Sequence, residues 1–196
     1  YFGFSHDEKA RRAAVEAELG ALASQQTERH RIRLELAPDG AFSFTSEPFR
    51  PDRRSWRAIL ASAPVAAENV RLFHKTTDRR IYDAALAEAR AAGADEAILW
   101  NERGELTEGT RTNLVLEIGG ERLTPARECG LLGGIFRHSL LERGKVREAV
   151  LTRDDLSRAR RVLLVNSLRG WIPAELVSRP AGQAGREARS RAPEGA

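Results

Sequence analysis

The sequence contains no methionine, a single cysteine and no long run of apolar residues. One cysteine, Cys129, excludes a disulfide within the chain and suits a reducing compartment. No apolar stretch approaches the roughly 20 residues that a membrane-spanning helix needs, and no signal-peptide pattern opens the chain. These absences predict a cytoplasmic protein that is not embedded in a membrane. Because Tyr1 is not an initiator methionine, we expect a fragment, a processed product or one domain of a longer polypeptide.

Charge of neither sign dominates, although the isoelectric point is high. Of 196 residues, 32 are Lys or Arg and 28 are Asp or Glu, so the net charge is +4 and the sequence pI is about 9.8. Binding to a nucleic-acid backbone favours a concentrated basic stripe. The densest basic segments here, 50–57 and 185–196, are typical of solvated surface. We therefore predict no nucleic-acid partner.

The order of patterns along the chain predicts an α+β fold. Residues 7–23 have the apolar spacing of an amphipathic helix, and residues 30–44 alternate around a Pro-Asp-Gly turn as a β-hairpin does. Residues 112–125 predict a second hairpin around two glycines. Further helices are expected at 78–92 and 154–160, and residues 130–144 predict a glycine-rich turn running into a helix. Further strands are expected at 56–65, 95–101, 147–152 and 161–167.

The composition also predicts where domains begin and end. Two sub-domains are expected to meet near residue 66, giving a small domain at 1–66 and a larger one at 67–179. Residues 180–196 consist largely of Pro, Gly, Ala and Arg without apolar periodicity. That composition cannot bury enough apolar surface to fold, so we predict a disordered tail.

Metal and hydrolase chemistry have no support in the sequence. The four histidines, His6, His30, His74 and His138, are scattered, and Cys129 has no cysteine partner, so no zinc-ligand spacing occurs. No serine lies in a G-x-S-x-G elbow. No G-x-G-x-x-G follows a predicted strand, which argues against a dinucleotide-binding unit.

Lys75 lies between an apolar stretch and a predicted helix. A lysine in that place can point into a cleft, where loss of water lowers its pKa and keeps the amine nucleophilic, as Schiff-base chemistry requires. On a helix running from Lys75, Arg79 and Tyr82 would share its face. Taken alone, a lysine there is more often a surface residue at the end of a loop.

Three other segments offer polar groups of a suitable kind. Glu108 lies between a turn and a strand; a buried carboxylate there would keep a pyridine nitrogen protonated, whereas a hairpin glutamate would be solvated. Residues 133–138, "GGIFRH", form either an anion site or an ordinary turn at a helix N-terminus. Asn166, Ser167 and Arg169 end a buried strand, either at a cleft or in a plain loop.

Together, and in this order, the segments resemble the class IV aminotransferase family. The matching stretches, within roughly residues 70–175, are "HKTTDRRIYD", "DEAILWNERGELTEGTRTNLV", "LTPARECGLLGGIFRHSLL" and "VLLVNSLRGW". The resemblance implies the fold of fold-type IV enzymes (D-amino-acid aminotransferase-like), with an incomplete small N-terminal domain and a larger C-terminal domain. It also implies pyridoxal 5'-phosphate (PLP) as cofactor and a homodimer with sites near the interface.

The resemblance assigns roles in holding the cofactor. Lys75 matches the lysine that carries PLP as a Schiff base, and Glu108 matches the carboxylate that pairs with the pyridine nitrogen. The turn that binds the cofactor phosphate through backbone N–H groups matches Gly134, Ile135 and Phe136. Many relatives have a threonine in this turn, and "GIFR" supplies no such hydroxyl. We therefore expect weaker cofactor binding than in those relatives.

The resemblance also assigns contacts near the end of the chain. Ser167 matches a further phosphate contact, while Leu168 and Arg169 match positions that meet the substrate carboxylate. The opening "YFGF" resembles the segment that follows "H-L-x-R-L" in the family, a stretch whose arginine clamps the phosphate. A charge-assisted contact of that kind contributes roughly 1.5–3 kcal/mol, so its absence predicts a further loss of affinity.

Within the family, "HKTT", "WNERGELTE" and "NSLRGW" are most similar to the aminodeoxychorismate lyases, in particular those fused to an aminodeoxychorismate synthase component. This resemblance implies a lyase that converts 4-amino-4-deoxychorismate to 4-aminobenzoate and pyruvate for folate synthesis. One alternative is a transaminase of branched-chain or D-amino acids that uses the same Lys75 and Glu108. Another is an inactive remnant that serves only in dimerisation or interaction.

Overall fold

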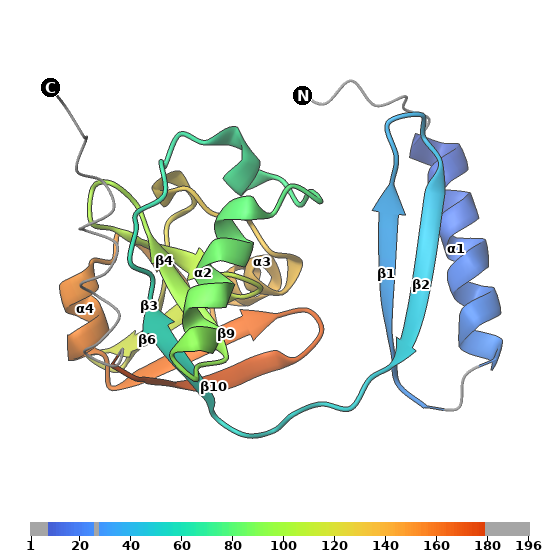
Figure 1. Cartoon of the computed structure of the whole chain (residues 1–196). Helices are drawn as coiled ribbons and strands as arrows, with labels where there is room; N and C mark the ends of the chain where they lie inside the picture. The colour runs from blue at the N-terminus through green and yellow to red at the C-terminus, as the bar shows by residue number, and fades with distance from the viewer. Residues whose placement is uncertain (1–7, 26–27, 179–196) are drawn as a thin grey trace, which may run out of the picture. The chain divides into compact units, whose positions relative to one another are not determined.

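The structure is a computed structural model that describes residues 8–25 and 28–178 (Figure 1). The predicted disordered tail, 180–196, lies outside these residues. The chain divides into two compact units, Tyr1–Asp52 and Arg53–Ala196. Among the described helices, none is long and apolar enough to cross a membrane.

The first unit contains the predicted helix and hairpin. Helix α1 spans Glu8–Gln25, and strands β1 (His30–Leu36) and β2 (Phe42–Pro48) pair antiparallel. The turn between the strands closes through a hydrogen bond from the Ala37 amide to the carbonyl of Ala41, 2.9 Å long. Gly40 has a φ of +91° there, a conformation that a residue without a side chain adopts at little cost. Both predicted elements are therefore confirmed.

The second unit is built on one sheet of eight strands in the order β5-β4-β3-β10-β9-β6-β7-β8. The strands are β3 (Trp56–Leu60), β4 (Glu96–Trp100), β5 (Leu106–Gly109), β6 (Asn113–Ile118), β7 (Glu121–Pro125), β8 (Arg147–Ala149), β9 (Arg161–Asn166) and β10 (Gly170–Leu176). The β5 strand also pairs with β6. Six strands thus close into a ring, and β7 and β8 extend it.

The helices of this unit are η1 (Val70–Phe73), α2 (Arg80–Ala91), η2 (Arg127–Cys129), α3 (Ile135–Glu142) and α4 (Arg153–Arg158). The observed elements confirm the predicted second hairpin, β6–β7, whose turn glycines both have positive φ. Helix α2 begins two residues later than predicted, and its N-cap is Arg79. It ends where predicted, before Gly93, whose φ is +68°.

Strand β10 was not predicted, and it changes the assignment of β3. It pairs antiparallel with β9 and parallel with β3, which in turn pairs parallel with β4. Residues 56–60 therefore belong to the sheet of the second unit, and the division falls after Asp52 rather than near residue 66. Only pairing between strands far apart in sequence reveals this, since the isolated pattern of 56–65 fits either domain.

Buried side chains form one cluster inside the ring and others on its outer face. One buried cluster takes side chains from all six ring strands, including Ile98, Leu106, Leu114 and Leu164, and so fills the interior. Alternate residues of the same strands point outward. On that outer face α2 packs against β3 and β4, while α3 packs against β6 and β9 near Val115. Figure 1 shows α2 lying across the strands.

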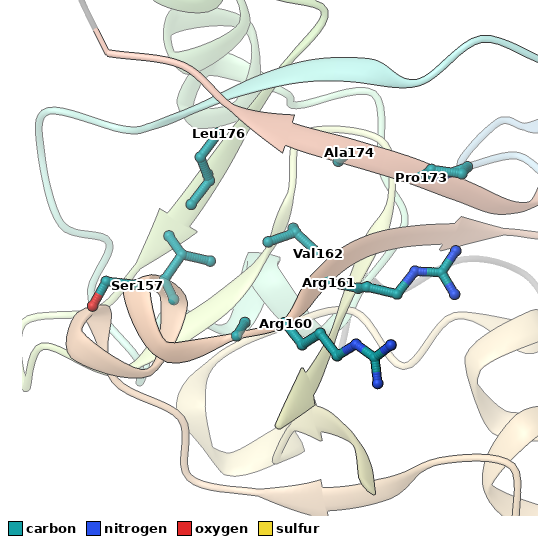
Figure 2. Close-up of a pocket in the computed structure, with 9 residues that line it drawn as sticks. Ser157, Arg160, Arg161, Val162, Pro173, Ala174 and Leu176 are labelled. Atoms are coloured by element: carbon teal, nitrogen blue, oxygen red, sulfur yellow. The ribbon is translucent and has the colours of Figure 1, made fainter. Parts of the chain in front are cut away.

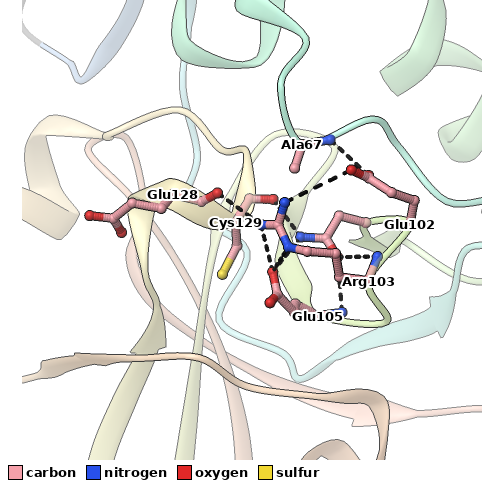
Figure 3. Close-up of polar contacts among 7 residues, drawn as sticks. Ala67, Glu102, Arg103, Glu105, Glu128 and Cys129 are labelled. Carbon is pink, nitrogen blue, oxygen red and sulfur yellow. Dashed lines mark hydrogen bonds and ion pairs between the residues drawn. The ribbon is translucent and has the colours of Figure 1, made fainter.

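A polar network joins the β4–β5 turn to η2 (Figure 3). Arg103 donates to the Glu105 carboxylate at 2.9 Å and to the carbonyl of Glu128 at 3.0 Å. Asn101 donates to the carbonyl of Cys129 at 2.9 Å. Burial is the main reason that the pKa of the Cys129 thiol rises to about 11, so this cysteine is unreactive. The network fixes the chain just before the glycine-rich segment.

Gly130 continues this fixed path. Its φ is +90°, and a β-carbon there would lie 2.8 Å from backbone atoms of Ala67. Two backbone segments therefore touch directly at this glycine. The contact sets the course of residues 131–134, which lead into α3.

Candidate active site

Glu108 is the centre of the most unusual polar cluster in the described chain. It lies on β5, is 4% exposed, and faces helix α2 and the segment before α3. Its Oε1 accepts hydrogen bonds from the Tyr82 hydroxyl at 2.8 Å and from the Leu132 amide at 3.1 Å. From the described residues, its Oε2 accepts only a long bond, 3.4 Å, from Asn113 Nδ2. Oε2 is thus the oxygen with acceptor capacity left for another donor.

Burial raises the pKa of Glu108 to about 8, and it is the largest cause. The Tyr82 hydrogen bond and the Leu132 amide act in the opposite direction by favouring the carboxylate. The nearby charge of Glu96 raises the pKa further, whereas the positive charge of Lys75 lowers it. Near neutral pH, Glu108 therefore holds a proton in the cofactor-free chain.

The pKa of Tyr82 changes for a related reason. Burial, followed by the charge of Glu108 and the hydrogen bond to it, raises the pKa of Tyr82. The phenol therefore stays protonated and acts as a fixed donor. Arg79 lies over its ring, with 5.0 Å from the guanidinium carbon to the ring centroid.

The Lys75 segment joins η1 to α2. Asp78 ties its two ends together, because its carboxylate pairs with Arg71 of η1 and with Arg80 of α2. A hollow of about 420 Å³ lies between these elements, with Leu72 and Tyr82 in its lining. Lys75 itself is exposed, so the burial expected for its amine is not seen in the described chain. Its charge nevertheless acts on Glu108.

Helix α2 starts at Arg80 and does not include Lys75, so Lys75 and Tyr82 do not share a helix face. Their relation comes instead from tertiary structure. Lys75 lies in the segment before α2, and Tyr82 reaches Glu108 from the first turn of that helix.

The N-terminus of α3 brings the predicted phosphate-binding turn to the same region. Gly134 is the N-cap and has no side chain to satisfy the first amides of the helix. A β-carbon on Gly134 would lie 2.2 Å from Asn113 Oδ1, so only glycine fits there. The neighbouring Ile135 is 81% exposed. The amides of Ile135 and Phe136 thus lie at the start of a helix, next to Asn113, whose side chain contacts Glu108.

Phe136, in the predicted phosphate-binding turn, has a packing role. Its ring meets Trp171 edge-on, with 6.3 Å between centroids. It also lies 3.8 Å from the position of a β-carbon on Gly170. The missing hydroxyl is thus replaced by an aromatic contact that holds α3 to the β9–β10 hairpin.

The β9–β10 turn carries the remaining predicted residues. The side chain of Asn166 accepts the amides of Leu168 at 3.1 Å and Arg169 at 2.8 Å, which shapes the turn. Ser167 and Leu168 are exposed. The Arg169 guanidinium lies over Trp56, 5.3 Å from the ring centroid, and Trp56 belongs to the cluster inside the ring. The side chain of Arg169 is thus directed to Trp56.

Several members of the site were missed or only partly found from the sequence. Leu132 and Asn113 contribute a backbone amide and a side-chain amide, and neither group has a motif of its own. Tyr82 was noted only as a neighbour of Lys75. The signal that could have found them is the spacing between Glu108 and Asn113, which a tight β5–β6 hairpin places opposite each other.

A separate groove lies between α4 and the β9–β10 pair (Figure 2). It measures about 360 Å³, and Arg160 and Arg161 lie at its edge above an apolar floor that includes Val162 and Leu176. None of its lining residues contacts Glu108 or Lys75 in the described structure. No group of three metal-ligating side chains occurs among the described residues.

The burial of Glu108 predicts a pH-dependent stability. The unfolded chain ionises this group near its ordinary pKa of 4.5, whereas the folded chain does so near 8. The stability that protonated Glu108 contributes is fully present below pH 4.5. Between pH 4.5 and about 8 the free energy of unfolding falls by about 1.4 kcal/mol per pH unit. Denaturant unfolding across the window should show this slope. The Glu108→Gln variant should lose it, and an unchanged slope would contradict the assignment.

The family model described as "Amino-transferase class IV" matches residues 1–177. The chain therefore belongs to the class IV aminotransferase family. Members of this family use pyridoxal phosphate. One structural neighbour is a hypothetical aminotransferase from Mycobacterium tuberculosis in its PMP-bound form, which is 21% identical with a TM-score of 0.77; the match covers 93% of this chain and 73% of that structure.

Two relatives are more similar in sequence. A Schizosaccharomyces pombe protein named "Putative aminodeoxychorismate lyase" is 32% identical over 165 residues, covering 81% of this chain and 71% of its own length. A Mesorhizobium loti structure named "Putative amino-acid aminotransferase" is 38% identical with a TM-score of 0.80; the match covers 89% of this chain and 84% of that structure.

A lyase structure also shares the fold. The "Putative 4-amino-4-deoxychorismate lyase" of Legionella pneumophila is 24% identical with a TM-score of 0.66; the match covers 76% of this chain and 59% of that structure. At that identity it supports the fold alone.

Proposed function

We propose that this chain binds PLP and acts as an aminodeoxychorismate lyase, which forms 4-aminobenzoate and pyruvate. The observation that carries the proposal is the buried Glu108, with Oε1 held by two donors and Oε2 left for a third. A carboxyl group in such a place can pair with the nitrogen of a pyridine ring. The uncapped α3 and the nearby Lys75 supply the other two contacts that PLP needs.

The residues fit the cofactor in charge and in shape. Lys75 would hold it covalently through its amine, and Glu108 would contact its ring nitrogen. The amides of Ile135 and Phe136 would bind its phosphate, because helix N-termini attract anions. Gly134 lets the start of α3 approach Asn113 closely, because a β-carbon there would collide with Asn113 Oδ1. When bound, PLP supplies an electron sink for carbanion chemistry.

The chain's own residues then move the protons. Lys75, once its amine is free, removes the proton from the amine-bearing carbon of 4-amino-4-deoxychorismate. The bond between the ring carbon and the ether oxygen breaks. The side chain leaves as enolpyruvate, which takes up a proton to become pyruvate. Glu108 keeps a proton at the ring nitrogen throughout. Loss of the side chain makes the ring aromatic, which supplies the driving force and leaves 4-aminobenzoate.

The lyase is favoured over other activities by the similarity to the S. pombe protein, which extends over 81% of this chain. The second candidate is an amino-acid transaminase. The Mesorhizobium structure named for that activity is 38% identical, so this candidate has a specific observation behind it as well. Both reactions use the same lysine and carboxylate, but only the transaminase needs an added 2-oxo acid.

The deciding experiment supplies 4-amino-4-deoxychorismate to the PLP-loaded chain without any 2-oxo acid. We expect pyruvate and 4-aminobenzoate in equal amounts. Dependence on an added 2-oxo acid, with consumption of an amino acid, would instead select the transaminase. Turnover of neither kind by a chain that carries PLP would reject both and favour an interaction module.

A further inference from the structure

Glu96 is a fully buried carboxylate that the mechanism does not use. It lies at the start of β4 and has 0% exposure. Its Oε1 accepts the amides of Ala97 at 3.1 Å and Thr110 at 2.9 Å, together with the Thr110 hydroxyl. Its Oε2 accepts the Arg111 amide and the Thr112 hydroxyl, both at 3.2 Å. Four of these five donors come from one turn, 110–112.

That turn connects β5, which carries Glu108, to β6. Gly109 packs so closely on it that a β-carbon would lie 2.3 Å from Thr112 Oγ1 and 3.1 Å from Glu96 Cδ. The turn is therefore wrapped around the carboxylate. Among the described residues, no charged side chain donates a hydrogen bond to Glu96, and the Arg111 guanidinium bonds the carbonyl of Asp95 at 2.7 Å.

The turn is linked to Glu108 by a second route through α2. The carbonyl of Thr110 accepts a 2.8 Å hydrogen bond from Arg79 Nη2. Arg79 in turn lies over the ring of Tyr82, whose hydroxyl donates to Glu108. The position of Glu108 is thus fixed through the chain, two residues before Thr110, and through the α2 side chains that bond it.

A fully buried carboxylate without a cationic partner is costly, and apolar side chains of similar volume often fold as well or better. A structural turn does not require such a group. The charge also has an effect at the site, because Glu96 is among the causes that raise the pKa of Glu108. The other charged or titratable groups that act on Glu108 are Tyr82 and Lys75, with Arg79 acting on Tyr82.

We propose that Glu96 is a positioning residue of the active site: its carboxylate fixes the 110–112 turn and thereby directs Glu108 Oε2 toward the cofactor ring. The part that concerns the cofactor rests on the proposed function. The part that concerns Glu108 holds for the cofactor-free chain and can be tested there.

The test uses the full chain without cofactor and the variant Glu96→Gln. Carboxyl carbon-13 NMR follows the protonation of Glu108, with Glu108→Gln identifying its signal. We expect the titration midpoint of Glu108 to shift to lower pH in Glu96→Gln, because the variant removes a negative charge and admits water. We also expect faster amide hydrogen exchange at Thr110 and Arg111, whose N–H groups lose a charged acceptor.

Glu117→Gln is the matched control, since Glu117 is a partly buried carboxylate at the far end of β6, paired with Arg122 and Arg161. It should change neither the Glu108 midpoint nor exchange in the turn. An unchanged midpoint in Glu96→Gln, or an equal shift in the control, would overturn the proposal. A midpoint shift without faster exchange at Thr110 and Arg111 would indicate a direct effect of the charge alone and would also overturn the proposal.

Two milder variants keep the test decisive if Glu96→Gln does not fold. Thr110→Val and Thr112→Val each remove one hydroxyl donor and keep the Glu96 charge. Both should speed exchange in the turn and move the Glu108 midpoint by less than Glu96→Gln; no change in either quantity would overturn the proposal. Failure of the wild-type chain to bind PLP would reject the proposed function and leave these cofactor-free results unaffected.

Discussion

Replacing Lys75 with alanine should abolish covalent attachment of PLP and reduce turnover by at least about 10²–10⁴-fold. Proton transfer by a positioned side chain alone contributes a factor of that size. The loss should be larger still, because the same amine forms the covalent link to the cofactor. The fold should persist, since Lys75 is exposed and lies in a segment that Asp78 holds through Arg71 and Arg80.

Borohydride reduction in the presence of PLP, followed by peptide mapping, measures the attachment directly. The other lysines of the chain are Lys9 and Lys145, so a label can be assigned without ambiguity. Lys145→Ala is the matched control, because Lys145 is also exposed and lies just before β8. It should keep both label and turnover. A label on Lys9 or Lys145 in the wild-type chain, or none, would contradict the assignment of Lys75.

Local patterns predicted the local structure well. Alternation around Gly40 and around Gly119-Gly120 predicted both hairpins, and apolar periodicity predicted α1 and α2. These elements depend on residues close in sequence, whose turn and cap preferences act over a few positions. The order of the motifs also identified the family, which the match over residues 1–177 confirms.

Long-range pairing could not be predicted in the same way. The ring closes because β5 pairs with β6 and β10 joins β3, and no local pattern encodes such partners. The sequence therefore did not reveal that residues 56–60 belong to the second unit. The exposure of Lys75 differs from expectation for a similar reason, since burial depends on what packs over a segment and not on its own composition.

The site shows the same difference between what local motifs predict and what tertiary contacts determine. Glu108 was found through its motif, but its three donors come from α2, from the segment before α3 and from β6. Glu96 lies in one of the matching stretches but was given no role there, and its contacts appear only when the 110–112 turn folds around it. Roles assigned to Ser167, Leu168 and Arg169 remain predictions, and the contact of Arg169 with Trp56 gives that residue a structural use as well.

The second large effect is expected for Glu108→Gln, which should lower turnover by roughly ten- to a hundredfold. A hydrogen bond that involves a charged group contributes about 1.5–3 kcal/mol, and a neutral amide has no negative charge with which to keep the ring nitrogen protonated. Binding of PLP should weaken less than turnover does, because Lys75 and the α3 amides remain. Parallel titrations of cofactor binding and rate would separate the two quantities.

Tyr82→Phe provides the comparison that isolates the role of the proton. It removes a donor from Oε1 but leaves the carboxyl group, and since that donor lowers the pKa of Glu108, its loss should raise the pKa further. We expect a much smaller loss of rate than in Glu108→Gln. Equal losses in both variants would mean that packing, and not the proton, determines the effect.

The raised pKa of Glu108 also predicts how cofactor binding depends on pH. Below about 8 the carboxyl already holds the proton that the ring nitrogen requires, so binding only redistributes it between Oε2 and that nitrogen. Above 8 the carboxylate has lost this proton, and binding must take one up from solvent. The dissociation constant should therefore rise up to about tenfold per pH unit above that point in the wild-type chain. In Glu108→Gln this dependence should disappear, and its persistence there would assign the proton to another group.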